Sequence, residues 1–527
     1  MKYYLSIILI LCCVSCARIA MPTGGDKDIK PPKSITANPK DNTTNFHSNT
    51  FEVTFDEYIE LDNVAQKLIV SPPLQSKPEV SSRLKTIRVK WNDTLRPNTT
   101  YIFDFADAIK DYTEGNHLGN FSYSFSTGEI IDSLSYFGKA VEAFTLKPVS
   151  NKLVILYNTE RGRAIMHTEQ PDYVTRLDTF GVFRFRNIAS GQYNLLILDD
   201  KNQNLYYDLP TEGIAFSDKP VTPFFSKDSV IKADSLPIYY FFEPPDTILN
   251  IDKKLLSDRK LQIVFSQPPS DSVHIDFADT TLQTINVFSA KRDTLTCFAI
   301  GNRTFDTLNA EIVCGNFKET LLMYYFQKRK SKTDSTFAII PPNNTLDYFD
   351  KLRLELPFPC EENIEIKACL IEDSICDSIT FISHTTYLES RDLLQEGKHY
   401  KLVLSQGIFD NLISQSNDSL TTAFSVTTKE DYGRITLNFD SVKPLIIILE
   451  DLNGKEIARK NIADAQCIFS NLKENKYKVK IIDDKSRNGK WDGGDFDAER
   501  QPESVKYYDK VLNVRKNWEI EEKCVSH

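Results

Sequence analysis

Cysteine and histidine are scarce in this 527-residue chain, which holds ten cysteines and seven histidines. Beyond residue 16 the cysteines are odd in number, widely spaced and without CxxC pairs, which argues against a disulfide framework and a zinc site. Most of them are expected to be buried apolar side chains, and an oxidising compartment would permit a local bridge such as Cys369 to Cys376. The set comprises Cys297, Cys314, Cys360, Cys369, Cys376, Cys467 and Cys524.

Catalytic signatures are also lacking. The histidines are scattered, and no HExxH, GxSxG or P-loop spacing occurs. The acidic pair Asp56 and Glu57 follows a strand pattern, where neighbouring side chains point to opposite faces and cannot share a proton. The sequence therefore predicts a protein that is not an enzyme, although side chains from separate domains can meet in space without leaving a sequence motif.

Positive charge is in the minority. The 63 lysines and arginines against 73 aspartates and glutamates give a net charge of -10 and a pI near 5.4. Because nucleic-acid binding depends largely on basic side chains that release counterions, this balance argues against a nucleic-acid partner. A mean hydropathy of -0.33 argues against an integral membrane protein, except at the N-terminus.

The N-terminus carries the long apolar run of the sequence. Lys2 precedes residues 3–14, which are too few to span a bilayer and are typical of a secretory signal. Residues 13–16 (Cys-Val-Ser-Cys) resemble a lipobox, at which bacterial processing attaches lipid to the cysteine that becomes the new N-terminus. That residue is Cys16, because Ser15 supplies the small residue that should precede it. A plain secretory signal with an incidental cysteine is the alternative.

The lipobox resemblance implies an outer membrane lipoprotein held by several fatty acyl chains such as palmitate, since one chain alone gives only reversible binding. Its first partner would therefore be the membrane. Residues 17–30 contain proline and glycine without periodicity, and they are expected to form a tether. No acidic residue occurs in residues 17–21, which slightly favours a periplasm-facing protein over one exported to the cell surface.

Apolar residues alternate with polar ones along almost the whole chain, as in Phe51, Val53 and Phe55. A period of two is typical of half-buried strands, so the predicted fold class is all-β. Helix is expected only as short turns near residues 63–68 and 391–395.

Two internal repeats give the order of the domains. The first repeat relates two sets of five residues at one constant offset. The earlier set is Tyr101, Ile109, Asp111, Phe125 and Ser126, and the later set is Tyr400, Ile408, Asp410, Phe424 and Ser425. The second repeat relates nine residues of an earlier copy to nine of a later copy, again at one constant offset. The earlier copy comprises Phe185, Asn187, Ile188, Tyr193, Asp199, Asp200, Lys201, Asn204 and Asp208, and the later copy comprises Phe469, Asn471, Leu472, Tyr477, Asp483, Asp484, Lys485, Asn488 and Asp492. The second repeat indicates a strand, a tight turn, another strand and an acidic loop.

Residues 95–101 and 125–128 resemble the end of a surface-layer-type (SbsA-type) bacterial Ig-like domain. Residues 138–157 and 181–193 are similar to carboxypeptidase-regulatory, transthyretin-like domains. These resemblances imply tandem Ig-like and transthyretin-like β-sandwiches, and they transfer no catalytic residue. The expected segments are a signal peptide (1–16), a tether (17–30), an Ig-like domain (31–128), a transthyretin-like domain (130–245), an uncertain β-sandwich (250–338), a second Ig-like domain (340–428) and a second transthyretin-like domain (430–527).

The acidic loop of the second repeat has the spacing of a calcium loop. Residue types that suit a hard cation fall at positions 1, 3, 5, 7, 9 and 12, with Gly489 at position 6, where the chain must turn sharply. The candidate ligands are Asp484, Ser486, Asn488, the carbonyl of Lys490, Asp492 and Asp495. An Asx-rich turn without metal is an equal alternative.

The earlier copy of this loop is a weaker candidate for calcium. It offers Asp200, Asn202, Asn204 and Asp208, but Leu205 stands where glycine is wanted, which favours a turn without metal. The sequence predicts no other cofactor.

Two functions fit these features. The first is a non-enzymatic, lipid-anchored envelope protein that acts as a spacer or protein-interaction module. The second is a calcium-dependent surface adhesin that binds a carbohydrate or a peptide. The partner, whether an envelope protein or a glycan, is unknown from the sequence.

Overall fold

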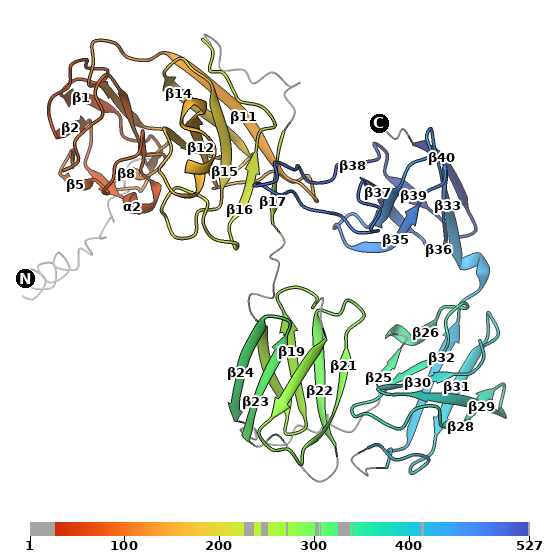
Figure 1. Cartoon of the computed structure of the whole chain (residues 1–527). Coiled ribbons are helices and arrows are strands. Elements are labelled where there is room, and N and C mark those ends of the chain that lie inside the picture. The colour runs from red at the N-terminus through yellow and green to blue at the C-terminus, as the bar shows by residue number, and fades with distance from the viewer. Residues whose placement is uncertain are drawn as a thin grey trace, which may run out of the picture. The chain divides into compact units, whose positions relative to one another are not determined.

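The computed structural model describes residues 27–225, 237–243, 251–269, 272–300, 305, 307–324, 338–340, 342–412 and 416–524. The signal segment, Cys16 and most of the tether lie outside these residues. Within the described ranges the regular secondary structure is almost wholly β-strand, with only short helical turns (Figure 1), which confirms the all-β fold class. No helix in these ranges is long and apolar enough to cross a membrane. The chain divides into two compact units, Met1–Glu142 with Lys147–Phe241, and Ala143–Leu146 with Phe242–His527.

The first module of unit 1 packs a four-stranded and two three-stranded sheets around an aromatic core. In its central strand, Phe51, Val53 and Phe55 are buried while the residues between them are less so, as the period of two requires. Its elements are β1 (Ser34–Asn38), β2 (Thr50–Phe55), β3 (Ile59–Leu61), α2 (Val64–Lys67), β4 (Ile69–Ser71), β5 (Glu79–Arg83), β6 (Thr86–Lys90), β7 (Thr100–Asp104), β8 (Ile109–Asp111), β9 (His117–Leu118) and β10 (Ser122–Ser126).

The second module of unit 1 is one seven-stranded sheet in the order β13-β12-β15-β16-β17-β11-β14, which closes around its own core. Its central strands are continuous apolar runs, as expected for strands covered on both faces. The elements are β11 (Leu134–Glu142), β12 (Leu153–Asn158), η1 (Thr159–Arg161), η2 (Ala164–His167), β13 (Tyr173–Arg176), β14 (Val182–Ile188), β15 (Tyr193–Leu198), β16 (Gly213–Phe216) and β17 (Ile238–Phe242).

Unit 2 begins with two further β modules, each with a separate core. The third module pairs a four-stranded sheet with a three-stranded one, and the fourth is an eight-stranded sheet. The third comprises β18 (Ile251–Ser257), β19 (Lys260–Phe265), β20 (Val273–Phe277), β21 (Gln283–Phe288), β22 (Thr294–Ile300), β23 (Thr307–Cys314) and β24 (Phe317–Tyr324). The fourth comprises β25 (Ala338–Ile340), η3 (Pro342–Asn344), β26 (Thr345–Leu346), β27 (Arg353–Glu355), β28 (Glu365–Glu372), β29 (Ile375–His384), β30 (Tyr387–Ser390), β31 (His399–Leu404) and β32 (Leu420–Val426).

The fifth module ends unit 2 and repeats the strand pairing of the second. In each, the first long strand pairs antiparallel with one neighbour (β14 or β36) and parallel with the last strand (β17 or β40). The Tyr193 hydroxyl donates to the Ala189 carbonyl at 3.1 Å, and the Tyr477 hydroxyl donates to the Lys473 carbonyl at 2.7 Å. The elements are η4 (Lys429–Asp431), β33 (Tyr432–Phe439), β34 (Leu445–Glu450), β35 (Glu456–Ile462), β36 (Gln466–Lys473), β37 (Asn475–Asp483), β38 (Val505–Tyr507), β39 (Leu512–Val514) and β40 (Glu519–Cys524).

The other sequence repeat corresponds to one shared hairpin. Tyr101 lies opposite Phe125 in β7 and β10, and Tyr400 lies opposite Phe424 in β31 and β32. Around these hairpins the sheets differ, since the first module has three small sheets and the fourth has one large sheet. The repeat therefore predicts a local strand pair rather than the whole architecture of the module.

The described cysteines behave largely as expected. Cys369 and Cys376 form a disulfide across the β28–β29 hairpin. The others are free and buried, which confirms that they act as apolar side chains. They are Cys297, Cys314, Cys360, Cys467 and Cys524.

One of the two predicted helical turns is wrong. Helix α2 forms within residues 63–68, but residues 391–395 have no helix. The Arg391 N–H donates to the carbonyl of Thr380 in β29, and the Ser390 hydroxyl donates to the carbonyl of Asp392. Because these backbone groups bond to a neighbouring strand and to a side chain, a helical turn cannot form there.

A capping box at η4 lies between the fourth and fifth modules. Its aspartate, Asp431, is expected to stabilise the folded chain to an extent that depends on pH. The Thr428 N–H donates to Asp431 at 2.8 Å, and Lys516 lies 2.9 Å from the other carboxylate oxygen. The Thr428 N–H, followed by Lys516, lowers the pKa of Asp431 to about 2. Since an unfolded aspartate titrates near pH 4, this contribution is present above pH ~4 and is lost as the pH falls toward 2.

We therefore expect Asp431→Asn to lower the free energy of unfolding at pH 7 by about 1 kcal/mol, a modest value because the ion pair is partly exposed and screened. Urea unfolding at pH 7 and at pH 2.5 would measure the change. The difference between Asp431→Asn and the parent should shrink at the lower pH. The exposed Asp464→Asn serves as the control, and an Asp431→Asn effect equal at both pH values would contradict the assignment.

Candidate functional site

Two acidic loops follow equivalent strands, one after β15 in the second module and one after β37 in the fifth. Asp200 accepts the N–H groups of Asn204 and Leu205 at 3.2 and 3.0 Å. Asp484 accepts those of Asn488 and Gly489 at 3.1 and 3.0 Å. Each aspartate therefore folds the next five residues around its own carboxylate.

Leu205 adopts the same backbone conformation as the glycine of the other loop. Its φ is 69°, and that of Gly489 is 72°. Leucine in place of glycine therefore leaves the backbone of the first loop like that of the second, and the expectation of a turn without metal stays a prediction. The backbone strain of a left-handed leucine is offset because Asp200 holds its N–H group.

The predicted ligands of the second loop come together only in part. The Asn488 side-chain amide donates to both Asp492 carboxylate oxygens at 3.0 Å, and the Ser486 hydroxyl donates to Asp484 at 3.3 Å. Asp495 lies in a separate turn, where it accepts the N–H of Ala498 at 2.8 Å.

The remaining predicted ligands are also held by contacts within their loops. Lys490 donates its N–H to the Asn488 side-chain oxygen at 2.7 Å. In the first loop, the amides of Asn202 and Asn204 donate to Asp208 at 3.0 and 2.8 Å. Among the described residues, no group of three or more His, Cys, Asp or Glu side chains is arranged to hold a metal ion.

A buried glutamate under each loop was not predicted from the sequence. Glu212 accepts the N–H groups of Lys201, Asp208 and Leu209, and Glu503 accepts those of Ser486 and Asp492. Both side chains are buried. The repeat does not reveal them, because Glu212 lies 12 residues after Asp200 whereas Glu503 lies 19 residues after Asp484. The two glutamates are therefore not separated by the constant offset that relates the other residues of the repeat.

Lysines neutralise the acidic charge at the base of the first loop. Asp199 lies 2.7 Å from Lys152 and 2.6 Å from Lys201. Burial alone would raise the pKa of Asp199, but these two ion pairs hold it below its ordinary value. The carboxylate therefore stays ionised and is already paired, which leaves Asp200 and Asp208 as the acidic groups nearer the tip of the loop.

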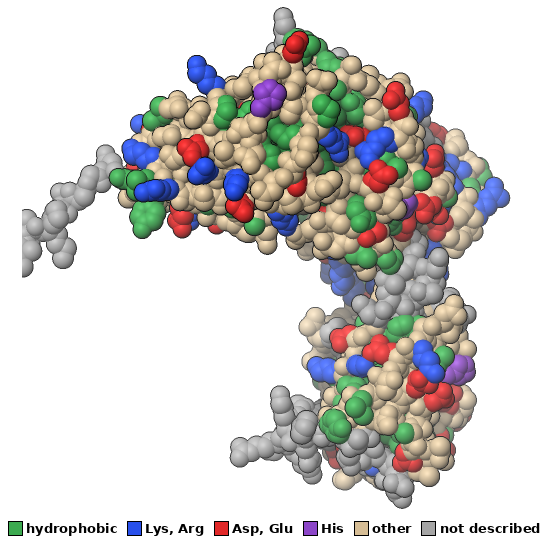
Figure 2. Space-filling view, turned by 60° about the vertical axis from the view of Figure 1, so that its left-hand side comes forward, with side chains coloured by type: hydrophobic (Ala, Val, Ile, Leu, Met, Phe, Trp, Pro, Cys, Tyr) green, Lys and Arg blue, Asp and Glu red, His purple; other side chains and the backbone are tan. Residues whose placement is uncertain are grey.

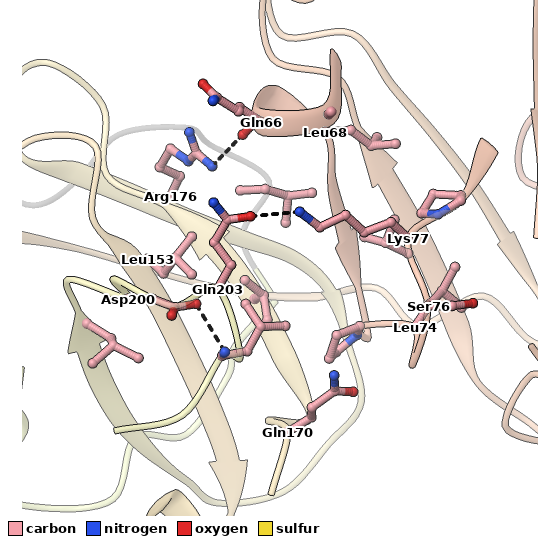
Figure 3. A pocket seen from close by; sticks show the side chains of 18 of the residues that line it. Gln66, Leu68, Leu74, Ser76, Lys77, Leu153, Gln170, Arg176, Asp200 and Gln203 are labelled. Atoms are coloured by element: carbon pink, nitrogen blue, oxygen red, sulfur yellow. Dashed lines mark hydrogen bonds between the residues drawn. The ribbon is translucent and has the colours of Figure 1, made fainter. Parts of the chain in front are cut away.

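A pocket of about 540 Å³ lies beside this loop, between the two modules of unit 1. Its walls come from residues around α2 and β4 of the first module and from β12, β13 and the Asp200 loop of the second. Figure 3 shows Lys77 and Gln203 meeting across it, with the lysine ammonium 2.7 Å from the amide oxygen. Aliphatic side chains and several amide side chains line it, and such a mixture of apolar walls and a few polar groups suits a peptide or another organic ligand more than an ion.

Polar contacts lock the two modules together beside this pocket. The Val174 N–H donates to the buried Ser71 hydroxyl at 3.0 Å, and the Arg176 guanidinium donates to the Gln66 carbonyl at 3.0 Å. Burial lowers the pKa of Arg176 and raises that of Asp104, and the opposite charges of these two residues partly offset both effects. The module junction is thus specific rather than a loose contact.

Comparison with known families identifies one part of the chain. A model described as "Bacterial Ig-like domain" matches residues 28–127, which correspond to the first module. An Ig-like domain of this kind is therefore present there. No curated protein sequence matches the chain.

Several solved structures share low similarity with the chain. The N-terminal part of the bacterial S-layer protein SbsC is 18% identical, with a TM-score of 0.14, over 37% of this chain and 42% of that one. The major pilin subunit BcpA of Bacillus cereus is 11% identical, with a TM-score of 0.14, over 74% and 99% of the two chains. The Bacillus anthracis TIE protein is 9% identical, with a TM-score of 0.15, over 96% and 76%.

Proposed function

We propose that this chain is a non-enzymatic outer membrane lipoprotein, anchored by acyl chains on Cys16, whose β modules act as a spacer and an interaction surface in the cell envelope. The lipobox-like residues 13–16 support the anchor, and the Ig-like domain supports a binding or structural role over catalysis. The absence of acidic residues from residues 17–21 supports a periplasm-facing position.

The observation that carries this proposal is the locked junction within unit 1. Ser71 is buried and bonded to the Val174 backbone, and Arg176 spans to the first module. A flexible hinge would leave such groups in water, whereas a rigid junction gives them hydrogen-bond partners, as it does for the Ser71 hydroxyl and one terminal nitrogen of Arg176. The pocket beside the junction gives the rigid body a concave surface for a segment of an envelope protein.

A photo-crosslinking amino acid at Gln75 tests the interaction role. Gln75 is exposed and lines the pocket, so we expect discrete crosslinked species in intact cells. Lys219 is an exposed residue of the second module outside the pocket lining, and the same probe there is expected to give none. Equal crosslinking at both positions, or none at either, would contradict the proposal that the pocket binds a segment of an envelope protein.

A calcium-dependent adhesin for a carbohydrate or a peptide is the second candidate, supported by the matching backbones of the two acidic loops. Asp200 and Asp484 hold the same turn, and each loop lies over a buried glutamate. Asparagine, aspartate and carbonyl oxygens are ligands that calcium accepts. The competing interpretation is that these contacts complete the turns without metal, since backbone N–H groups already bond to the carboxylates.

Thermal unfolding with calcium and with chelator separates these interpretations. If calcium binds, a saturating concentration should raise the unfolding midpoint by roughly 5 °C or more. Asp484→Asn should abolish the part of that shift due to the second loop. Asp451→Asn, in an ordinary aspartate turn of the same module, should keep it. A midpoint indifferent to calcium would leave the loops as turns, and glycan-array binding insensitive to chelator would exclude a calcium-dependent adhesin.

A further inference from the structure

Large hydrophobic side chains are exposed at one end of the first module, the end at which the chain enters it. Their exposed fractions run from 54% for Tyr58 to 79% for Ile29. We call this set the entry patch, and it comprises Ile29, Ile35, Tyr58, Leu84 and Tyr112. Within the described part of the first module, residues 27–128, these are the exposed large hydrophobic side chains. Figure 2 shows hydrophobic side chains beside lysines and arginines at this end, toward the left of the view.

Backbone hydrogen bonds hold the segments of the entry patch together. The Tyr112 N–H donates to the Tyr58 carbonyl at 2.9 Å, and the Ile59 N–H donates to the Leu84 carbonyl at 3.1 Å. The start of β1 pairs with the end of β2, which brings Ile35 to the same end. The entry segment joins them because the Asn116 side chain donates to the carbonyl of Asp28 at 3.0 Å.

Leu84 occupies a position that folding alone would not assign to leucine. It forms, with Lys85, the two-residue turn between β5 and β6, and its φ is 57°. Such turns favour glycine or asparagine, because a positive φ brings Cβ close to the following carbonyl oxygen, a cost that glycine avoids and that asparagine can offset with a local hydrogen bond. The fold of the module gains nothing from leucine at this position, and the exposed side chain is available for a contact outside the folded chain.

The length of chain between Cys16 and the entry patch limits how far the patch can lie from the membrane. Residues 17–27 separate Cys16 from Asp28, and a fully extended stretch of that length reaches at most about 40 Å. An acyl chain on Cys16 therefore keeps this end of the module near the lipid surface. The patch lies at the end from which the tether leaves, whereas Asn92, just after β6, lies at the opposite end of the strands.

We propose that the entry patch rests on the lipid surface, with Tyr58, Leu84 and Tyr112 at headgroup level, so that the first module stands on the membrane in one orientation. This inference rests on the proposed lipid anchor. Tyrosines suit the interface because the ring is apolar and the hydroxyl is hydrated. Lys85 lies 5.6 Å from the Tyr58 ring centre, where its ammonium can stay in water while its stem adds to the apolar surface.

Apolar contact rather than charge should drive this docking. Lys30, Lys33 and Lys85 lie near Asp28 and Asp56, but Glu57, Asp111 and Glu114 lie close by as well, so positive charge is not in excess at this end. Docking is therefore expected on neutral phosphatidylcholine vesicles and at high salt alike. This distinguishes the entry patch from a basic surface that needs anionic lipid.

An environment-sensitive fluorophore on Tyr112→Cys tests the docking in the full-length, acylated protein reconstituted into phosphatidylcholine vesicles. The native free cysteines of the described chain are buried, so an exposed engineered thiol can be labelled selectively. The matched control is Asn92→Cys, which is exposed at the other end of the module. Flotation of the vesicles establishes in the same sample whether the protein is anchored.

We expect the label at position 112 to shift to shorter wavelength and to be quenched several-fold more strongly than the label at position 92 by lipids with a spin label near the headgroup. A floating protein with two equally hydrated labels would overturn the docking and leave the anchor intact. A shifted but unquenched label at position 112 would place protein, such as a second copy, on the patch and would also overturn it. A protein that does not float would defeat the anchor and the docking together.

Leu84→Asn supplies a second test, which separates a membrane contact of Leu84 from a structural role of this residue in the turn. Asparagine fits the turn better than leucine, so the unfolding midpoint of this variant should be unchanged or higher. The quenching at position 112 should nevertheless fall by at least twofold. Unchanged quenching in this stable variant would overturn the role given to Leu84.

Discussion

Cys16→Ala is expected to abolish the incorporation of labelled palmitate and to remove the chain from the outer membrane fraction. Alanine has no sulfur to acylate, and each buried methylene of an acyl chain contributes about 0.8 kcal/mol to membrane binding, so the loss should be near complete. Labelling of growing cells followed by membrane fractionation would measure it.

Cys12→Ala is the matched control for this change, because it alters a cysteine of the same apolar run and leaves residues 13–16 intact. It should be labelled and sorted like the parent. Residual palmitate on Cys16→Ala, or its loss from Cys12→Ala, would place the modified sulfur elsewhere.

Phe125→Ala is expected to destabilise the first module by about 3–5 kcal/mol, because it leaves a large cavity in the aromatic core. The Phe125 ring is fully buried, with its centre 3.9 Å from that of Phe46 and 5.7 Å from that of Trp91. Urea unfolding followed by tryptophan fluorescence would report on this module through Trp91, in a background where Trp491 and Trp518 of the fifth module are replaced by phenylalanine. A loss of this size is a large fraction of the stability of a typical domain.

Phe180→Ala provides the surface control for the same substitution, since Phe180 is exposed in the second module. Its effect should stay within about 0.5 kcal/mol. If the two variants lost similar amounts of stability, the core assigned to the first module would be wrong.

The strands could be predicted from the sequence because a sheet with one buried face imposes a period of two on the side chains. Phe51, Val53 and Phe55 show this directly. The acidic loops were predicted from a constant offset, which is preserved where Asp200 and Asp484 fold the same turn. Their calcium role remains a prediction, because the hydrogen bonds that form these turns do not distinguish a calcium loop from a turn without metal.

What escaped prediction depends on contacts between distant segments. Glu212 and Glu503 lie at different distances from their loops, so no repeat marks them. The pocket brings Lys77 to Gln203 over more than a hundred residues, and no local pattern encodes that meeting. The helical turn at residues 391–395 failed for a similar reason, since the Arg391 N–H bonds to a strand that the local sequence does not reveal.

The mass of the N-terminal peptide of the mature protein, extracted from membranes, tests the central claim most directly. The account predicts that this peptide begins at Cys16 and carries the added mass of fatty acyl chains. A mature chain that begins at any other residue, or whose residue 16 carries no acyl group, would contradict the proposed lipid anchor and the membrane docking that depends on it.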